Sequence, residues 1–413
     1  MAATPLPTTS FPKDQIKVLL LENVSKTAHE IFSAEGFQVE ALKHSLPPDE
    51  LQRKLSDVHV LGIRSKTQVP AGALVDARRL LTVGCFCIGT NQVDLDAANR
   101  KGVPVFNAPF SNTRSVAELM LAEIIALGRQ LGDRSREVHE GKWRKVATNC
   151  FEIRGKTLGI VGYGHIGRQL GVIAESLGMR VLFYDHASKL PMGNNASVPS
   201  LGELLGHADF VTLHVPETPQ TKNMIGQAEL AQMKRGSYLL NASRGTVVVI
   251  PALAEALASG HLAGAAIDVY PEEPESNIDG FRTALQGLPN TILTPHIGGS
   301  TSEAQAAIGR EVATSLTKYM NSGATTGAVN FPNVELAGVR GSHRILNVHR
   351  NVPGVLRDIN KIVSDLNANI QGQVLATDPN IGYLIMDIDK DVSTDVFKAV
   401  AAIDTNIRTR ILY

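Results

Sequence analysis

Three residues whose side chains can bind an anion or move a proton lie in the second half of the sequence: Arg244, Glu273 and His296. Each follows or closely trails a short apolar run that is typical of a buried strand, and in open sheets of parallel strands the carboxyl ends open onto the ligand crevice. A guanidinium, a carboxylate and an imidazole there could polarise an oxygen atom and transfer its proton. Next to a nicotinamide this would be alcohol dehydrogenation, so the sequence predicts an enzyme. The three runs are 237–242, 263–269 and 291–294.

The three residue types suggest separate roles. The planar guanidinium of Arg244 can hold a substrate carboxylate together with the neighbouring C2 oxygen, which lysine would do less well. His296 can take and return a proton, because an unperturbed imidazole has a pKa of about 6.5. Glu273 could accept the other imidazole N–H and fix the tautomer. Glu272 is a competing carboxylate, and spacing alone leaves that choice open.

A glycine-rich turn upstream predicts a dinucleotide site. The apolar run 157–161 leads into Gly162, Gly164 and Gly167, and a helical pattern follows. Glycines there permit a tight turn and close approach of a pyrophosphate, which meets the N-terminus of the helix. Asp185 closes the next strand, 18 residues after Gly167, where a carboxylate binds both ribose hydroxyls. Because this carboxylate would repel a 2′-phosphate and no arginine follows it, we expect NAD rather than NADP.

The surrounding pattern predicts an α/β protein with two doubly wound parallel sheets. Strand-like runs alternate with helical segments on both sides of a long helix near residue 115, and Ser115 with Glu118 is predicted to form its capping box. Since only the second series carries the fingerprint, we expect a Rossmann-type NAD domain inserted into a discontinuous substrate-binding domain. The expected boundaries are a disordered 1–14, a substrate domain of 15–111 and 300–337, an NAD domain of 112–299, and a third domain of 340–413.

The third domain reads as strand, helix, strand, strand, helix, strand, the βαββαβ order of ferredoxin-like folds. A domain of this size is marginally stable alone, and pairing of an edge strand with a second copy would stabilise it. The sequence therefore predicts self-association through this module.

Composition excludes several classes of protein. The 40 basic and 40 acidic residues cancel, so no bulk field favours nucleic acid or an anionic membrane. The three cysteines have no metal-ligand spacing, and we expect no metal site and a reducing compartment. No apolar run is long enough to span a bilayer, and the first residues lack the pattern of a secretory signal. We expect a cytoplasmic protein.

The motifs resemble those of the D-isomer-specific 2-hydroxyacid dehydrogenases, most closely the phosphoglycerate-oxidising members that carry a C-terminal ACT domain. The resemblance extends from about Ile16 to Tyr413. It implies NAD-dependent oxidation of 3-phospho-D-glycerate to 3-phosphohydroxypyruvate, with 2-oxoglutarate reduction as a possible side activity, and a homotetramer. The segments that carry it are 162–167, 213–218, 241–245, 265–269 and 294–300.

Residue roles follow from matching these motifs. Arg244 resembles the substrate-binding arginine, Glu273 the partner of the histidine, and His296 the acid/base. The cofactor residues implied are Gly162, Gly164, His165, Ile166, Gly167, Asp185, His214, Pro216, Ala242, Ser243, Arg244, Asp268, His296, Gly298 and Gly299. The substrate residues implied are Arg64, Ser65, Ile88, Gly89 and Asn112.

The last domain resembles the ACT module, in which similar positions hold L-serine between two paired copies. His349, Asn351 and Asn369 are the implied effector residues, and the alternative for Asn351 is a helix cap. One departure from the family is Val249, where an aspartate is usual. We expect the loss of that side chain to cost a helix cap and no chemistry.

Two other functions are compatible with parts of the sequence. A glyoxylate or hydroxypyruvate reductase would share the catalytic residues without a preference for phosphate. A dinucleotide-sensing corepressor would share the fold and act through protein contacts. The ACT resemblance argues against both, because neither group commonly carries this module.

Overall fold

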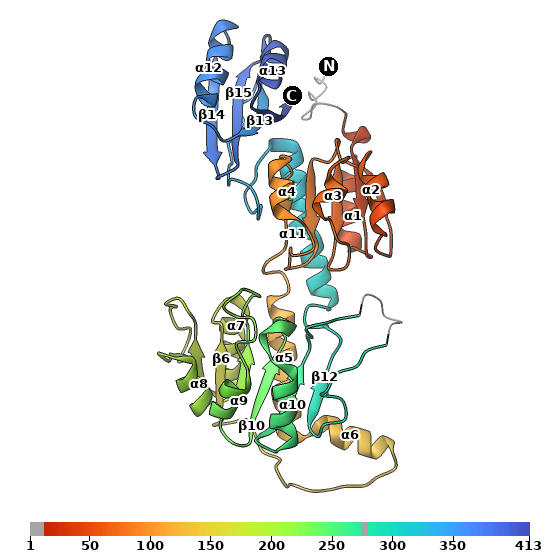
Figure 1. Ribbon diagram of the computed structural model, residues 1–413, viewed down its shortest axis with the longest axis vertical. Coiled ribbons are helices and arrows are strands. Elements are labelled where there is room, and N and C mark those ends of the chain that lie inside the picture. Colours follow the sequence, from red (N-terminus) through yellow and green to blue (C-terminus); the bar gives the residue numbers. More distant parts are fainter. Residues whose placement is uncertain (1–11, 275–279) are drawn as a thin grey trace. The chain divides into compact units, whose positions relative to one another are not determined.

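The computed structural model describes residues 12–274 and 280–413 and divides into two compact units. Unit 1 comprises the described residues up to Ser111 together with Gln305–Tyr413, and unit 2 comprises Asn112–Ala304. Figure 1 labels the elements of each unit. The expected disordered start falls largely outside the described residues, but Lys13–Gln15, which overlap it, form a short 3₁₀ turn.

The first part of unit 1 is a five-stranded parallel sheet with the order β2-β1-β3-β4-β5. Strands β1, β3 and β4 are almost entirely buried, because separate apolar clusters cover the two faces of the sheet. The order reverses between β1 and β3, which is the switch point where such sheets open a crevice. The edge strand β2 escaped prediction, since its polar residues are mostly exposed.

The elements of this part are β1 (Lys17–Leu20), α1 (Lys26–Ala34), β2 (Gln38–Ala41), α2 (Pro48–Leu55), β3 (Val60–Ile63), α3 (Ala71–Leu74), β4 (Thr82–Cys85), α4 (Leu95–Arg100), β5 (Val105–Phe106) and the long helix α11 (Ser302–Ser322), whose first residues belong to unit 2.

Unit 2 is a seven-stranded parallel sheet with the order β12-β11-β10-β9-β6-β7-β8. Read from β8, this is the dinucleotide-binding order 3-2-1-4-5-6 with one further strand, and it reverses between β6 and β9. Because every pair is parallel, the loops after the strands gather at one edge.

The elements of unit 2 are α5 (Thr113–Arg129), α6 (Leu131–His139), β6 (Thr157–Val161), α7 (His165–Ser176), β7 (Arg180–Tyr184), β8 (Ala196–Ser197), α8 (Leu201–His207), β9 (Phe210–Leu213), α9 (Gln227–Gln232), β10 (Ser237–Asn241), η2 (Gly245–Val247), α10 (Ile250–Ala258), β11 (Leu262–Ile267) and β12 (Thr291–Leu293).

The C-terminal module is a four-stranded antiparallel sheet with the order β14-β15-β13-β16 and two helices. Its elements are β13 (Ser342–Arg350), α12 (Val355–Asp365), β14 (Ile370–Thr377), β15 (Ile381–Asp389), α13 (Ser393–Ala401) and β16 (Asn406–Leu412), and the predicted βαββαβ order is confirmed. The two helices pack on one face of the sheet.

The other face of this module joins the core of unit 1. Leu346, Val348 and Tyr383 belong to the same buried cluster as Ile16, which immediately precedes β1, and Leu316 of α11. The Tyr383 hydroxyl donates a hydrogen bond to the Gly323 carbonyl at 2.6 Å. The module is therefore part of unit 1 in its packing, although its sequence pattern is that of a separate domain.

Two predictions about helix caps have different outcomes. The Ser115 capping box is wrong: α5 begins earlier, with Asn112 as its N-cap, and the Ser115 hydroxyl contacts Thr301 instead. The missing cap at α10 is confirmed, since Val249 occupies the N-cap and forms no side-chain cap hydrogen bond. Propensity rules predict which residue types form N-caps, but the position of the cap depends on the backbone conformation that precedes the helix.

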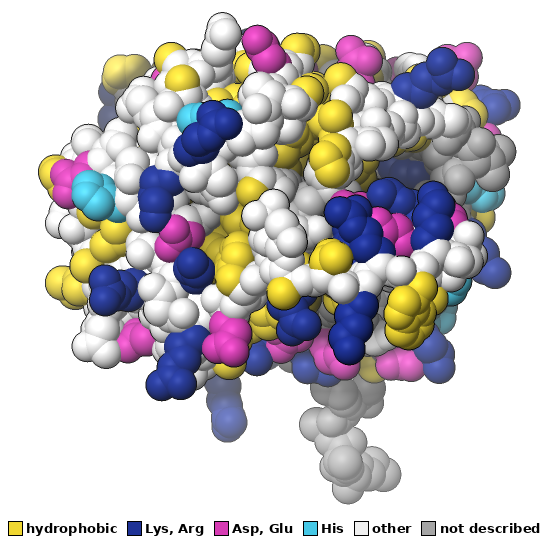
Figure 2. All heavy atoms as spheres, turned by 90° about the horizontal axis from the view of Figure 1, so that it is seen from below, with side chains coloured by type: hydrophobic (Ala, Val, Ile, Leu, Met, Phe, Trp, Pro, Cys, Tyr) yellow, Lys and Arg dark blue, Asp and Glu magenta, His cyan; other side chains and the backbone are white. Residues whose placement is uncertain are grey.

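The surface carries charges of both signs. Figure 2 shows basic and acidic side chains interspersed with apolar ones over the face in view. This agrees with the balance of 40 basic and 40 acidic residues. No helix in the described ranges is long and apolar enough to cross a membrane.

Candidate active site

The cofactor residues predicted from the sequence lie at the carboxyl edge of the sheet in unit 2. The glycine turn follows β6, Asp185 follows β7, and His214 follows β9. Arg244, Asp268 and His296 come after the next three strands, β10, β11 and β12. Parallel pairing therefore brings six segments that are far apart in the sequence to the same edge.

The glycine turn fits a dinucleotide pyrophosphate. Gly162 has a φ of 93°, which side chains rarely adopt, and a Cβ on Gly167 would lie 2.4 Å from the Gly162 carbonyl oxygen. Gly164, by contrast, has open space where a Cβ would be, and it is the N-cap of α7. A phosphate can approach the first turn of α7 there, where His165 and Ile166 begin the helix.

Asp185 lies where a ribose-binding carboxylate is expected. Its Oδ2 accepts a hydrogen bond from the Tyr163 N–H at 2.9 Å, and its Oδ1 accepts one from the Ala187 N–H at 3.1 Å. These bonds join the carboxylate to the glycine turn and hold its orientation. Each carboxylate oxygen can accept further hydrogen bonds, so the ribose hydroxyls remain suitable partners.

His296 and Glu273 form the central pair of the site. His296 Nδ1 lies 2.8 Å from Glu273 Oε2, which selects Glu273 over its neighbour Glu272 as the partner. The hydrogen bond to Glu273 raises the pKa of His296 above its usual value, although burial opposes the shift. Burial raises the pKa of Glu273, but the hydrogen bond and charge of His296 outweigh it and leave that pKa below normal. Both shifts favour an imidazolium–carboxylate pair.

Asp268 organises the loop that carries the histidine. Its carboxylate accepts hydrogen bonds from the Thr294 hydroxyl at 2.6 Å and from the Ile297 and Gly298 N–H groups at 2.8 Å each. His296 has a φ of 54°, an uncommon conformation for a residue other than glycine, and its N–H donates to the Asp268 carbonyl. The buried carboxylate therefore fixes a strained loop, which is typical of functional sites.

Arg244 extends from the loop after β10. Its Nη1 donates to the Ser243 carbonyl at 2.6 Å, and its own carbonyl accepts from Asn241 Nδ2 at 3.0 Å. Ala242 and Ser243 precede it, and the Ser243 N–H and hydroxyl both donate to the Asn241 side chain. The guanidinium is partly exposed, so it can bind an anion from solvent.

His214 belongs to the same edge but not to the proton pathway. Burial lowers its pKa to about 4, and its Nε2 lies 3.0 Å from the Thr212 hydroxyl. The imidazole is therefore neutral at physiological pH. Pro216 follows it in the same loop and is exposed.

The substrate residues predicted from the sequence divide between the two units. Arg64 and Ser65 follow β3 of unit 1, and Ile88 and Gly89 follow β4 of the same sheet. Asn112 lies in unit 2, and its buried Oδ1 has no hydrogen-bond partner among the described residues.

The effector residues differ in accessibility. Asn351 and Asn369 are exposed, and Asn351 Nδ2 donates to the Asp378 carbonyl at 2.7 Å. The N-cap of α12 is Gly354, so the alternative reading of Asn351 as a helix cap is wrong. His349 is buried, with Nδ1 at 2.8 Å from Asn347 Oδ1.

One titratable residue near the site escaped sequence analysis. Glu123 lies on the buried face of α5, and neither carboxylate oxygen has a hydrogen-bond partner within the described ranges. Burial, together with the charge of Asp268, raises the pKa of Glu123 to about 8. A glutamate at a helical core position, among Ala117, Met120 and Ile124, was the available signal.

Comparison with known proteins agrees with this geometry. Residues 121–298 match the family described as D-isomer specific 2-hydroxyacid dehydrogenase, NAD binding domain, and residues 345–408 match the ACT domain of the type described as AHAS small subunit-like. The chain is 58% identical over 407 residues to a D-3-phosphoglycerate dehydrogenase of Dictyostelium discoideum, covering 98% of this chain and 100% of that protein.

A bacterial relative and a solved structure extend the comparison. The D-3-phosphoglycerate dehydrogenase of Escherichia coli K12 is 52% identical over 407 residues, covering 98% of this chain and 99% of that protein. The crystal structure of D-lactate dehydrogenase from Aquifex aeolicus, complexed with NAD and lactic acid, is 26% identical with a TM-score of 0.63. That match covers 73% of this chain and 95% of the other.

Proposed function

The chain belongs to the D-isomer-specific 2-hydroxyacid dehydrogenases, and we propose that it oxidises 3-phospho-D-glycerate to 3-phosphohydroxypyruvate with NAD. The observation that carries this proposal is similarity over 98% of the chain to proteins named for that activity. The His296–Glu273 pair lies at the same edge of the sheet as the glycine turn and supplies the proton transfer that the reaction needs. This reaction would be the first step of the phosphorylated pathway of serine synthesis.

The proposed chemistry separates a hydride from a proton. NAD supplies the acceptor for the hydride that leaves C2. With Nδ1 engaged by Glu273, His296 would take the C2 hydroxyl proton on Nε2. The developing imidazolium is stabilised by Glu273, as a carboxylate does in a hydrolase triad. Arg244 would hold the substrate carboxylate together with the C2 oxygen.

The residues of unit 1 would recognise the rest of the substrate. We assign Arg64 and Ser65, with the backbone of Ile88 and Gly89, to the anionic groups of phosphoglycerate. The buried amide oxygen of Asn112 would accept a hydrogen bond from substrate or cofactor, which would satisfy an atom that otherwise lacks a partner.

An assay of NAD reduction tests the substrate. Activity with 3-phospho-D-glycerate should exceed activity with D-glycerate in kcat/KM. A preference for glycerate, or for glyoxylate and hydroxypyruvate in reverse, would support the reductase alternative. Absence of turnover with all of these acids would favour a corepressor-like binding protein. Reduction of 2-oxoglutarate by NADH, assayed in parallel, tests the side activity.

L-serine is the proposed effector of the ACT module. Asn351 and Asn369 are exposed, and they lie at opposite ends of β15, Asn351 near Asn380 and Asn369 near Asp389. A small amino acid would therefore bridge Asn351 of one copy and Asn369 of a second copy. The buried position of His349 suggests that it supports Asn347 rather than contacts the ligand directly. Asn351→Ala should raise the serine concentration needed for inhibition and leave uninhibited turnover nearly unchanged. Asp391→Ala, in an exposed turn of the same module, is the matched control, and an equal response to serine in both variants would contradict the assignment.

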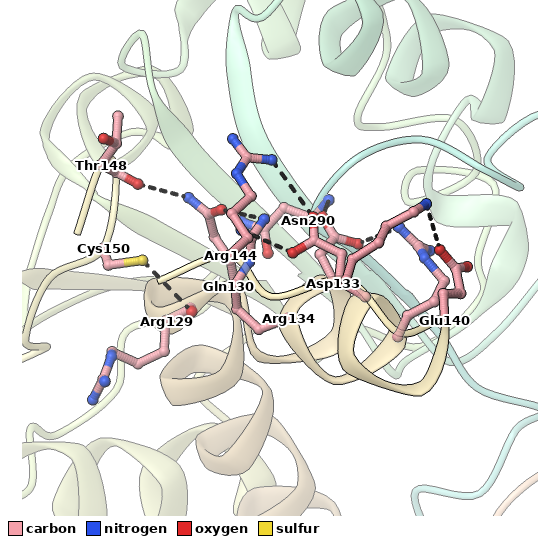
Figure 3. Close-up of polar contacts among 12 residues, drawn as sticks. Arg129, Gln130, Asp133, Arg134, Glu140, Arg144, Thr148, Cys150 and Asn290 are labelled. Carbon is pink, nitrogen blue, oxygen red and sulfur yellow. Dashed lines mark hydrogen bonds and ion pairs between the residues drawn. The ribbon is translucent and has the colours of Figure 1, made fainter. Parts of the chain in front are cut away.

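The proposed assembly is a homotetramer with two types of interface. One would use the edge strand β14 of the ACT module. The other would use the segment around α6, which is fastened to unit 2 by an Asp133–Asn290 hydrogen bond of 2.7 Å (Figure 3). Trp143 in this segment is 85% exposed, which is unusual for a tryptophan and typical of a protein contact. Analytical ultracentrifugation tests the proposal: Trp143→Ala should shift the enzyme to a smaller species. We also propose a cytoplasmic location.

A further inference from the structure

Glu22 is a buried glutamate two residues beyond the end of β1, at the switch point of the sheet in unit 1. It is 8% exposed and has a φ of 64°, and the next residue, Asn23, has a φ of 55°. Two consecutive residues other than glycine in the left-handed region are strained, and such strain persists where surrounding contacts fix it. Their N–H groups donate to the carbonyls of His44 and Leu42. This strained turn fixes the backbone from which the Glu22 side chain extends.

The Glu22 carboxylate is bound by the loop that follows β3. Its Oε1 accepts hydrogen bonds from the N–H groups of Thr67 at 2.8 Å and Arg64 at 3.3 Å, and its Oε2 accepts one from Lys66 at 2.9 Å. Within the described ranges, no ion pair joins Glu22 to a lysine or an arginine. The backbone from Arg64 to Thr67 is therefore wrapped around the Glu22 carboxylate.

Gln92 joins this loop to the loop that follows β4. The Gln92 side chain is buried, and its Nε2 donates to the carbonyl oxygens of Arg64 at 2.7 Å and Gly89 at 3.3 Å. Asn107 Nδ2 donates to the Ile88 carbonyl at 2.6 Å. Three side chains that arise after β1, after β4 and after β5 thus hold the two loops in one arrangement.

We propose that Glu22 and Gln92 are positioning residues for substrate binding. They preorganise the loops of Arg64 and Ile88–Gly89, so that binding does not have to order the backbone. This inference rests on the proposed function, which assigns those loops to the substrate. Because Glu22 occupies three N–H groups that could otherwise bind an anion, the loop recognises the substrate through the Arg64 side chain.

A simple charge effect predicts the opposite result. If Glu22 acted only through its negative charge near an anion site, neutralising it would strengthen binding of an anionic substrate. If it positions the loop, neutralising it weakens binding, because a glutamine offers one acceptor oxygen and an NH₂ group in place of two acceptor oxygens. The sign of the change in KM therefore decides between the two roles.

The experiment compares Glu22→Gln and Gln92→Met with Glu40→Gln in the full-length enzyme. Glu40 is an exposed glutamate on β2 of the same sheet and pairs with Lys54, so it is a matched control. We measure KM and kcat for whichever 2-hydroxy acid the wild type oxidises best, and KM for NAD. Loss of hydrogen bonds to a charged group should raise KM for the acid about 10- to 100-fold. KM for NAD and kcat should change less than about threefold, and Glu40→Gln should behave as wild type.

Each outcome decides the inference. An unchanged or lower KM for the acid in folded Glu22→Gln would overturn it, as would equal increases in KM for the acid and for NAD. If Glu22→Gln is insoluble, Gln92→Met carries the test by the same criteria. If neither variant folds, the two residues serve the fold as a whole and the specific role is overturned. Failure of the wild type to oxidise 3-phosphoglycerate would instead refute the proposed substrate and leave the Glu22 comparison valid.

Discussion

The two parallel sheets of this protein differ in how the backbone N–H groups at their switch points are used. Both reverse strand order once, between β1 and β3 in unit 1 and between β6 and β9 in unit 2. At the switch point of unit 2, Gly164 leaves open space at the start of α7, and the backbone there can meet a phosphate. At the switch point of unit 1, Glu22 takes the backbone N–H groups itself. In unit 2 the backbone N–H groups at the switch point are available to a ligand. In unit 1 they are already bound by a side chain of the protein itself.

Two buried glutamates show the same contrast at the level of single residues. Glu22 is 8% exposed, and its carboxylate accepts hydrogen bonds from three backbone N–H groups. Glu123 is 4% exposed and has no hydrogen-bond partner in the described part of the chain. Its pKa of about 8 follows from that difference, since burial without donors favours the neutral acid. Two carboxyl groups with similar burial therefore differ completely in their hydrogen bonding.

The largest expected effect concerns the chemistry at the edge of unit 2. His296→Asn should lower kcat by at least about 100-fold, because it removes the proposed proton acceptor. The affinity for NADH, measured by fluorescence titration, should stay near wild type. A variant with wild-type turnover would remove His296 from the mechanism and would leave unit 2 as a binding surface only.

The contrast between the two glutamates predicts opposite effects of the same substitution. Glu123 has a raised pKa, so wild type loses stability as pH rises from about 4.5 toward 8, where the unfolded chain releases a proton that the folded chain keeps. Glu123→Gln removes this loss. Relative to wild type, the variant should gain on the order of 3 to 5 kcal/mol between pH 4.5 and 8 and no more above it. The burial cost of the amide is the same at both pH values and cancels.

Calorimetry of the full-length protein at several pH values checks this prediction. Glu22→Gln serves as the comparison, since it removes an acceptor that three N–H groups use, and it should lower the melting temperature. If the stability of Glu123→Gln relative to wild type did not rise between pH 4.5 and 8, the distinction between a satisfied and an unsatisfied carboxyl would not hold.

The pairing of His296 with Glu273 should be visible in the pH profile. The base must be neutral to accept a proton, so kcat/KM for oxidation should fall as pH drops through the raised pKa of His296. Glu273→Gln removes the hydrogen-bonded carboxylate and should move this acidic limb to lower pH. The plateau should fall roughly 10- to 100-fold, because the imidazolium loses its stabilising partner. An unshifted limb would mean that another group titrates.

Cofactor choice tests whether Asp185 completes the dinucleotide site of unit 2 by binding the ribose. Asp185→Ser should weaken NAD binding about 10-fold, since a charged hydrogen-bond acceptor for the ribose is lost. The ratio of kcat/KM for NAD over that for NADP should fall with it. A wild type that already prefers NADP would contradict the role of this carboxylate.

The smallest expected effect concerns the uncapped helix α10. Val249→Asp would place a carboxylate at the N-cap, where the backbone already has the extended conformation that caps adopt. We expect a gain of about 1 kcal/mol in unfolding free energy and unchanged kinetics. Val249→Ala is the control. A change in kcat would show that the segment between Arg244 and α10 affects catalysis.

Sequence patterns predicted most of unit 2, because its site is made of residues that end successive strands. Gly162, Asp185 and His296 are separated widely in the chain, yet the rule for parallel sheets places them at one edge. The order of strands and helices in the C-terminal module was also predicted correctly. The choice between Glu272 and Glu273 needed the structure, since spacing leaves both within reach of His296.

The residues that escaped prediction share a physical reason. Glu22 and Gln92 act on the backbone of segments about 40 and 28 positions away, and a hydrogen bond to a distant N–H or carbonyl leaves no periodicity in the sequence. Glu123 is a single polar residue on an otherwise apolar helix face, and one exception does not change a prediction based on periodicity. The packing of the C-terminal sheet into unit 1 escaped because one βαββαβ pattern fits both a free module and a docked one.

The shared core of unit 1 has a consequence for biosynthesis. Ile16 and Leu412 belong to the same buried cluster, so this core closes only after the ribosome has translated nearly every codon in between. Unit 2 is continuous in sequence, and its strands can pair while translation proceeds. During translation the sheet of unit 2 can therefore be folded while the apolar strands of unit 1 are still exposed. A nascent-chain chaperone would bind these exposed strands during that interval.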